Sequence, residues 1–318
     1  MPLVTELELP ALDHTDPELR GERYRQAMAA LRGHDGWLAS NPYGVTVLDR
    51  EAGEFFLRTR DAVFPGLTIA QIFGITDGPL YEEIVRNIIN LGGADHGRLR
   101  KLVNPALSPR AVERYRPAMR RFLAQLLDSV PAGGRLDFVE SFAKPYPSLV
   151  IAEVMGAPLT DAPRLHHFSN MIQRQFDSGS LTTELEAINQ SVAEFYAYED
   201  ELIAARRRRP GEDLISALIS AGTTSEAEAD PVGPAGGPQG DRLSHDELRN
   251  LILNILVGGV DTSQSQLAHA IRLLAEHPDQ WRALREDPRR LALAAVEEAL
   301  RYEPITPFTA RMTTDEVE

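Results

Sequence analysis

The chain has 318 residues, of which 43% are hydrophobic and 25% charged, a composition typical of a folded globular protein. Its 33 basic and 47 acidic side chains give a formal net charge of −14, which argues against a nucleic-acid-binding protein. The sequence contains no cysteine, so these residues can form no disulfide, no thiolate-bound metal site and no cysteine nucleophile.

No segment has the pattern of a targeting signal or a membrane span. The N-terminus is acidic and lacks a basic region followed by an apolar run. The longest apolar run, residues 251–260, is too short, because a transmembrane helix needs about 20 residues. We therefore expect a soluble, cytoplasmic protein without a membrane partner.

The first third of the chain is expected to contain the β-structure. Residues 43–48 alternate and are β-branched, which predicts a strand, and residues 53–57 fit either a second strand or a helix. Between residues 66 and 93 glycines interrupt any periodicity. This predicts a long loop with one short helix at 81–90, and loops of that length inside a domain often carry function.

Helical patterns dominate from residue 95 onward. Asp95 is predicted to N-cap a short helix that stops near Pro105. Ser108 and Pro109 are predicted to open a second helix that continues to about Ser129. Further helices are expected at residues 138–155, 161–177, 184–209 and 213–221.

Residues 223–241 are rich in Pro, Gly and acidic residues, which predicts a flexible surface loop inside the domain. Ser244 and Glu247 then have the spacing of a capping box. The helix that they open is predicted to run unbroken to about residue 276, roughly 50 Å. A last helix begins at Asp287-Pro288 and ends near Tyr302. The predicted fold class is mostly α with a minor β-sheet (α+β).

The long helix contains two adjacent glycines, Gly258 and Gly259, each of which costs roughly 1 kcal/mol in a helix relative to alanine. They could serve close helix packing, or they could leave room for a bulky, flat ligand. Asp261 and Thr262 follow them directly, and a carboxyl and a hydroxyl at this place could relay protons.

Two further pairs have helical spacing. His96 and Arg100 lie four residues apart and could bind a carboxylate or a phosphate, although a solvated helix face would look the same. Glu298 and Arg301 lie three apart, as ion pairs do on most helices. The sequence has no histidine pattern of a metal site, no phosphate-binding glycine loop and no nucleophile elbow.

Taken in order, these weak motifs resemble those of the bacterial cytochromes P-450, the haem-thiolate monooxygenases. Residues 94–103, followed by 107–110, look like the C-helix of that family, and residues 258–262 look like the oxygen-activation motif of its long I-helix. Glu298 to Arg301 resembles the Glu-x-x-Arg of the K-helix, and residues 308–318 resemble the strand after it. The resemblance covers essentially the whole chain and implies one domain, 1–318, with the cytochrome P-450 fold.

The resemblance implies haem b as the cofactor, with dioxygen, a small organic substrate and a ferredoxin-type redox partner. His96, Arg100 and Arg311 would pair with the haem propionates. Gly258 and Gly259 would let the I-helix pass over the haem. The expected reaction is hydroxylation or epoxidation of the substrate.

The resemblance also assigns the remaining polar residues. Asp261 and Thr262 would deliver protons to bound dioxygen, so that one oxygen atom leaves as water. Glu298 and Arg301 would be structural and would hold the K-helix against a later loop.

One departure from the family concerns the iron ligand. The family holds iron through a Cys in a loop after the K-helix, and this sequence ends at Glu318 without any Cys. One explanation is a fold that lacks its C-terminal haem-ligand segment, as an inactive fragment of a monooxygenase that does not necessarily bind haem. The alternatives are a cysteine-less auxiliary partner protein without haem chemistry, or a non-functional remnant. We favour the fragment, because the haem-clamping and oxygen-handling residues are all present.

Overall fold

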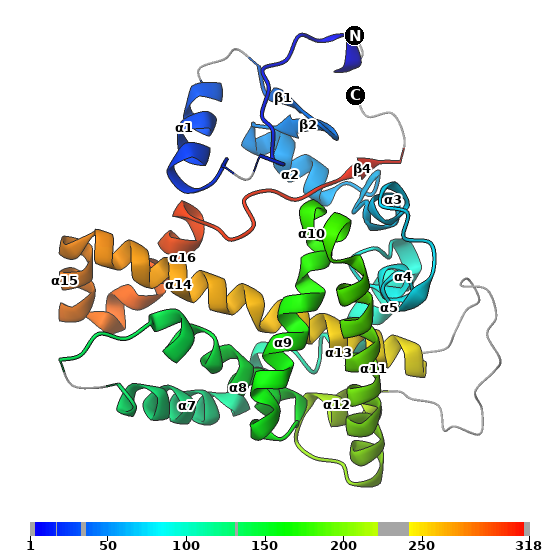
Figure 1. Cartoon of the computed structure of the whole chain (residues 1–318), viewed down its shortest axis with the longest axis vertical. Helices are drawn as coiled ribbons and strands as arrows, with labels where there is room; N and C mark the ends of the chain where they lie inside the picture. Colours follow the sequence, from blue (N-terminus) through cyan, green and yellow to red (C-terminus); the bar gives the residue numbers. More distant parts are fainter. Residues whose placement is uncertain (1–3, 17, 33–35, 131–132, 222–241, 315–318) are drawn as a thin grey trace. The chain divides into compact units, whose positions relative to one another are not determined.

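The computed structural model describes residues 4–16, 18–32, 36–130, 133–221 and 242–314 (Figure 1). The flexible loop predicted at 223–241 lies outside the described residues. The chain divides into two compact units, a smaller one that ends at Pro65 and resumes at Thr309, and a larger one, Gly66–Phe308. None of the helices described is both long and apolar enough to cross a membrane.

The smaller unit contains two short antiparallel strand pairs, in which Leu38 lies opposite Val47 and Ala62 opposite Thr313. The strand predicted at 43–48 is confirmed as one member of the first pair. The elements of this unit are η1 (Val4–Glu6), α1 (Gly21–Leu31), β1 (Leu38–Asn41), β2 (Gly44–Val47), α2 (Arg50–Arg58), β3 (Ala62–Val63) and β4 (Met312–Thr313).

The segment that fits either a strand or a helix forms helix α2. Its start is fixed by Asp49, whose side chain accepts a hydrogen bond of 2.9 Å from the Ala52 amide. An N-cap of this kind satisfies one of the free amides of the first turn. The helical alternative is therefore the one that the structure adopts.

The larger unit is helical throughout its described residues, which confirms the predicted fold class. Its α-helices are α3 (Gly66–Ile72), α4 (Gly78–Arg86), α5 (Gly93–Val103), α6 (Pro109–Val112), α7 (Arg116–Asp128), α8 (Pro145–Met155), α9 (Ala162–Gln173), α10 (Ser178–Thr183), α11 (Leu185–Arg208), α12 (Leu214–Ser220), α13 (His245–Gly259), α14 (Asp261–Glu276), α15 (Pro278–Glu286) and α16 (Pro288–Tyr302).

The long loop predicted between residues 66 and 93 is wrong, because this segment contains α3 and α4. Gly74 and Gly78 have positive φ angles of 69° and 84°, and they lie outside or at the start of the helices. Leu80 and Ile84 of α4 are buried in the core. The glycines thus separate two helices and do not prevent them, and burial of the apolar residues stabilises each short helix.

Two predicted helix starts have different outcomes. Asp95 is not the N-cap of α5, since Gly92 occupies that position and Asp95 lies in the first turn, where a carboxylate still favours the helix dipole. Ser108 is confirmed as an N-cap, with its hydroxyl accepting from the Ala111 amide at 3.3 Å. The helix that it opens ends at Val112 and is followed by a 3-10 turn, Glu113–Tyr115. Helix α7 begins as a separate helix at Arg116, where the next residue, Pro117, has no amide to continue the helical ladder.

The prediction of one unbroken helix from residue 244 to 276 is also wrong in one respect. The capping box of Ser244 and Glu247 is confirmed. The helix is interrupted at Val260, which divides it into α13 and α14.

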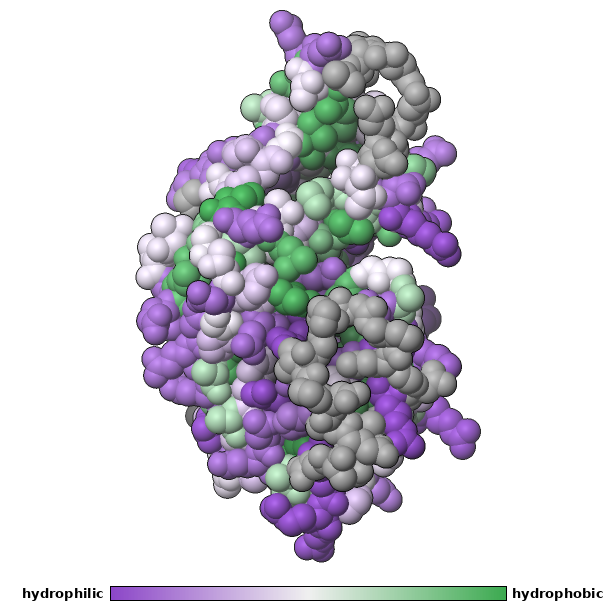
Figure 2. All heavy atoms as spheres, turned by 90° about the vertical axis from the view of Figure 1, so that its right-hand side faces the viewer, coloured by the Kyte–Doolittle hydropathy of each residue, from purple (hydrophilic) through white to green (hydrophobic). Residues whose placement is uncertain are grey.

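Helices α4, α8, α9 and α11 pack against helix α13 (Figure 1). Leu253 and Leu256 of α13 are 1% and 0% exposed. In the same cluster of buried residues the rings of Phe168 and Phe195 meet edge to face, with 5.5 Å between their centroids. The core thus fixes α13 tightly just before the interruption. On the face shown in Figure 2, hydrophilic side chains dominate the surface and apolar residues form smaller groups between them.

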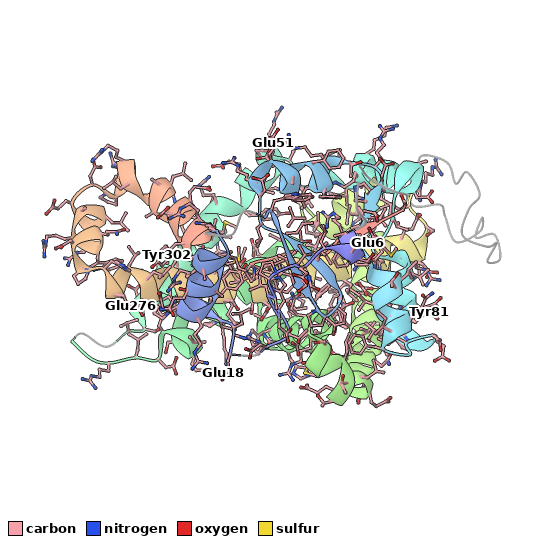
Figure 3. All side chains as sticks on the ribbon, turned by 90° about the horizontal axis from the view of Figure 1, so that it is seen from above. Glu6, Glu18, Glu51, Tyr81, Glu276 and Tyr302 are labelled. Atoms are coloured by element: carbon pink, nitrogen blue, oxygen red, sulfur yellow. The ribbon has the colours of Figure 1, made fainter. Side chains whose placement is uncertain are left out.

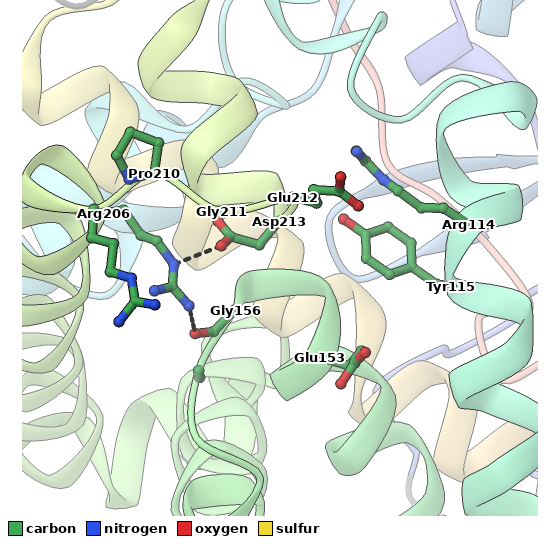
Figure 4. A pocket seen from close by; sticks show the side chains of 11 residues that line it. Arg114, Tyr115, Glu153, Gly156, Arg206, Pro210, Gly211, Glu212 and Asp213 are labelled. Atoms are coloured by element: carbon green, nitrogen blue, oxygen red, sulfur yellow. Dashed lines mark hydrogen bonds and ion pairs between the residues drawn. The ribbon is translucent and has the colours of Figure 1, made fainter.

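A hollow lined mainly by charged residues lies where the ends of α8 and α11 meet the start of α12 (Figure 4). The Arg206 Nε lies 2.6 Å from Asp213 Oδ2, and an Nη of Arg206 donates to the Gly156 carbonyl. Asp213 also caps α12 through the Ser216 amide at 2.8 Å. These bonds connect three helix ends, and we interpret the hollow as a structural corner.

We expect Gly156→Ala to lower the free energy of unfolding by about 2 kcal/mol or more. Gly156 has a φ of +75°, which costs other residues roughly 1 kcal/mol or more. An added Cβ would also lie 2.5 Å from the Asp213 carboxylate and 2.7 Å from Arg206 Nη2. The control is Gly133→Ala, which has a similar φ of +68° but no atom within 4 Å. Urea unfolding of both variants measures the difference, and equal losses would show that the corner tolerates the added carbon.

Candidate active site

The glycine pair lies where α13 ends and α14 begins. Val260, between them, has φ −99° and ψ −70° and belongs to neither helix. Its amide still donates to the Leu256 carbonyl at 3.2 Å, and its carbonyl accepts from Gln264 at 3.0 Å. Both bonds run to the carbonyl four residues earlier, as in a continuous helix, so the interruption is a local distortion of the backbone at Val260. Local distortions of this kind in long helices frequently mark functional sites.

Side chains help to satisfy the carbonyl groups at this interruption. The Thr262 hydroxyl donates to the Gly258 carbonyl at 2.5 Å, and the Ser169 hydroxyl of α9 donates to the Leu256 carbonyl at 3.4 Å. Back-bonding of a threonine to the carbonyl four residues earlier is a known cause of helix bending. The Thr262 oxygen keeps its lone pairs and can still accept a hydrogen bond.

The two glycines have different surroundings. A Cβ built on Gly259 would lie 2.9 Å from Ile151 Cδ1 of α8, so this glycine permits close helix packing. A Cβ on Gly258 would have no neighbouring atom within 4 Å, and Gly258 is exposed although the residues just before it are buried. The packing alternative therefore describes Gly259, and the open space lies beside Gly258. That a cofactor fills this space stays a prediction.

Asp261 opens α14 and is half-buried. Burial raises the pKa of its carboxyl, while the nearby His166 ring and a hydrogen bond from Asn170 act in the opposite direction. The Asn170 Nδ2 donates to Asp261 Oδ1 at 3.1 Å, and His166 Nε2 lies 2.7 Å from Gln264 Oε1. Sequence reasoning missed His166, Asn170 and Gln264, because no local spacing connects residues almost a hundred positions apart.

His96 and Arg100 lie on α5 with one free polar group each. His96 Nδ1 is 3.0 Å from the Ile88 carbonyl, which leaves Nε2 without a partner in the described structure. The Arg100 side chain is exposed, and its guanidinium has no hydrogen-bond or ion-pair partner among the residues described. Arg98, between them, is instead paired with Glu247 of α13. His96 and Arg100 can therefore bind an anionic group, and neither forms a hydrogen bond to the α13–α14 junction.

Glu298 and Arg301 form a two-point ion pair on α16, with both N–O distances at 2.7 Å. The arginine lowers the pKa of Glu298, but the two side chains are 53% and 68% exposed. The contacts that connect α16 to α14 come from elsewhere. Glu303 pairs with Arg272, and Gln266 Nε2 lies 3.3 Å from the Glu303 carbonyl.

The ends of these two helices are labelled by Glu276 and Tyr302 in Figure 3. The Tyr302 ring meets the His277 ring edge to face, with 6.4 Å between the centroids.

Arg311 belongs to the smaller unit and bonds locally, to the Ala310 carbonyl at 2.7 Å and to the Thr309 hydroxyl at 3.1 Å. Its pairing with a propionate stays a prediction. In the described residues no group of three or more His, Asp or Glu side chains is placed to hold a metal ion.

Comparisons with known proteins show to which family the chain is related. Residues 75–318 match the family described as Cytochrome P-450. Luteothin monooxygenase of Streptomyces thioluteus is 32% identical over 303 residues, which cover 95% of this chain and 70% of that protein. Cytochrome P-450 107B1 of Saccharopolyspora erythraea is 32% identical over 323 residues, covering 98% and 72%. The crystal structure of CalO2 superposes with a TM-score of 0.78 at 27% identity, covering 97% of this chain and 76% of that one. None of these supports a cysteine-less auxiliary protein, and the chain belongs to the cytochrome P-450 family, whose fold and haem-dependent monooxygenase chemistry it shares.

Proposed function

We propose that the α13–α14 junction is the part of this monooxygenase that handles dioxygen and protons. The proposal is carried by one observation: an open space and two proton-exchanging side chains lie next to each other at the helix interruption. Open space beside Gly258 is followed within four residues by a half-buried carboxyl and a hydroxyl, those of Asp261 and Thr262. The substrate that we propose is a small organic molecule, which is hydroxylated or epoxidised.

Haem b is the cofactor of the family, and the residues of this chain fit it in part. A Cβ at residue 258 would occupy the open space, so glycine keeps room there for a flat ring. The Arg100 guanidinium has the charge and the donor groups to hold a propionate, and His96 Nε2 can donate to a second one when both nitrogens of its ring carry a proton, because Nδ1 donates to the Ile88 carbonyl. The 318 residues contain no Cys to provide the thiolate ligand. When bound, the haem supplies the binding and reduction of dioxygen.

Asp261 and Thr262 would manage the proton supply. Since burial raises the pKa of the Asp261 carboxyl, this group holds a proton closer to neutral pH than an exposed aspartate does. The Thr262 hydroxyl is oriented by the Gly258 carbonyl, so its oxygen can accept a hydrogen bond from a group in the open space. The side chains thus offer one proton donor and one oriented acceptor.

The family implies a redox partner, and we propose a ferredoxin-type one. The support is charge complementarity, because exposed arginines follow one another on α6 and α7, including Arg110, Arg120 and Arg121. A basic surface steers an acidic partner to it. We further propose that residues 1–318 belong to a single domain and that the protein works in the cytoplasm.

Titration of the apo chain with hemin tests the cofactor assignment. We expect His96→Leu and Arg100→Leu each to weaken hemin binding roughly tenfold, because each removes a charge-assisted hydrogen bond to a propionate. Arg110→Leu, an exposed arginine of α6, is the control and should bind as the parent does. Binding unchanged by all three substitutions would contradict the propionate assignment, and a parent chain without hemin binding would contradict a haem site within these residues.

A further inference from the structure

Helix α9 packs against both α13 and α14 (Figure 1). Two of its polar side chains form hydrogen bonds to α14. His166 Nε2 lies 2.7 Å from Gln264 Oε1, and Asn170 Nδ2 donates to Asp261 Oδ1 at 3.1 Å. The two residues of α9 are four apart and their partners on α14 three apart, which are the spacings that place side chains on one face of a helix. Helices α9 and α14 are therefore joined by two neighbouring hydrogen bonds.

The two hydrogen bonds differ in the chemistry of the group on α14. Gln264 is a neutral amide, so the bond from His166 contributes mainly to the position of the two helices. The bond from Asn170 ends on a carboxyl group, and an amide donor stabilises the ionised form of a carboxyl more than the protonated form. His166 and Asn170 are the groups whose charge or hydrogen bond acts on Asp261 among the residues described, and both come from α9.

We propose that Asn170 is the positioning residue of Asp261, and that the hydrogen bond between His166 and Gln264 keeps α9 in the register that Asn170 needs. The inference rests on the proposed function of Asp261 as a proton donor. Asn170 fixes the direction in which one carboxyl oxygen points and leaves Oδ2 as the atom that can carry the proton. A displacement of α9 relative to α14 would break this bond and change both the orientation and the acidity of Asp261.

The test is the pKa of Asp261, measured in the full 318-residue chain by carbon-13 NMR of labelled aspartate carboxyls. The signal is assigned by its loss in Asp261→Asn. We expect Asn170→Leu to raise the pKa of Asp261 by about one pH unit, because the ionised carboxylate loses its donor while its burial remains. Asn170→Ser is a second variant with a milder change in packing. Its hydroxyl is too short to reach Asp261, so it should raise the pKa in the same direction.

The control is His167→Ala, which alters an exposed residue of the same helix. It should leave the pKa of Asp261 unchanged. An unchanged pKa in both Asn170 variants would overturn the inference. The result is separate from the hemin titration, because a raised pKa without hemin binding would refute only the cofactor site. Hemin binding with an unchanged pKa would refute only the role of Asn170.

Discussion

Glu83→Gln is expected to make the protein more stable than the parent at pH 8, by about 3 kcal/mol, with the gain disappearing at acidic pH. Glu83 lies on α4 with none of its surface exposed, and burial raises the pKa of its carboxyl to about 7 from an ordinary 4.5. A difference of one pH unit corresponds to about 1.4 kcal/mol, which gives the expected size. At pH 8 the folded parent must keep a buried charge that the glutamine variant does not have.

The surroundings of Glu83 offer little compensation for that charge. The Asn87 amide donates to Oε1 at 2.6 Å, while Oε2 has no partner in the described structure. The Glu83 backbone carbonyl accepts from Asn250 of α13 at 3.1 Å, so the buried carboxyl lies at the contact between α4 and α13.

The direction of the pH dependence follows from proton binding. Between about pH 4.5 and 7 the folded state keeps a proton on Glu83 that the unfolded state has released. The stabilisation is complete below the unfolded pKa and is lost as the pH rises through the folded one. Burial also raises the pKa of Glu199, which adds a loss of the same sign in both proteins. The difference between variant and parent therefore isolates Glu83.

Urea unfolding at several pH values between 5 and 8 measures this difference. Glu82→Gln, at the exposed neighbouring position on the same helix, is the matched control and should show no such trend. A difference between Glu83→Gln and the parent that stays constant with pH would mean that Glu83 is ionised or protonated in both states alike.

Sequence patterns predicted helices well where a local signal controls them. Ser244 with Glu247 and Asp287 with Pro288 were identified as helix starts because capping acts over three or four residues. The same patterns could not predict the interruption at Val260, because the two glycines before it weaken a helix without showing where it breaks. That break is supported by Ser169, which approaches from another helix, and by Thr262.

The candidate site shows the same limit. Gly258, Asp261 and Thr262 could be selected from the sequence because they are adjacent, and the family resemblance gave them roles. Asn170 could not be selected, since its relation to Asp261 exists only after α9 has packed against α14. The difference between Gly258 and Gly259 also depends on tertiary structure, because only the position of Ile151 distinguishes the surroundings of the two glycines.

Gly258→Phe is expected to weaken hemin binding by a hundredfold or more without destabilising the fold. No atom lies within 4 Å of the position where its Cβ would be, so the aromatic ring can enter the open space that we assign to the cofactor. Replacing glycine inside a helix also removes a cost of up to about 1 kcal/mol, which offsets part of the exposure of the new ring. Hemin titration and urea unfolding of the same preparation measure the two effects together.

Two substitutions make this result specific. Gly53→Phe changes another helical glycine with open surroundings, in α2 of the smaller unit, and should leave hemin binding intact. Gly259→Leu should have the opposite pair of effects: it should destabilise the fold and leave hemin binding intact. Its Cβ would lie 2.9 Å from Ile151 Cδ1, so overpacking should cost about 1–3 kcal/mol of stability. If Gly258→Phe binds hemin as tightly as the parent, the space beside Gly258 is not the cofactor site, whatever the stability data show.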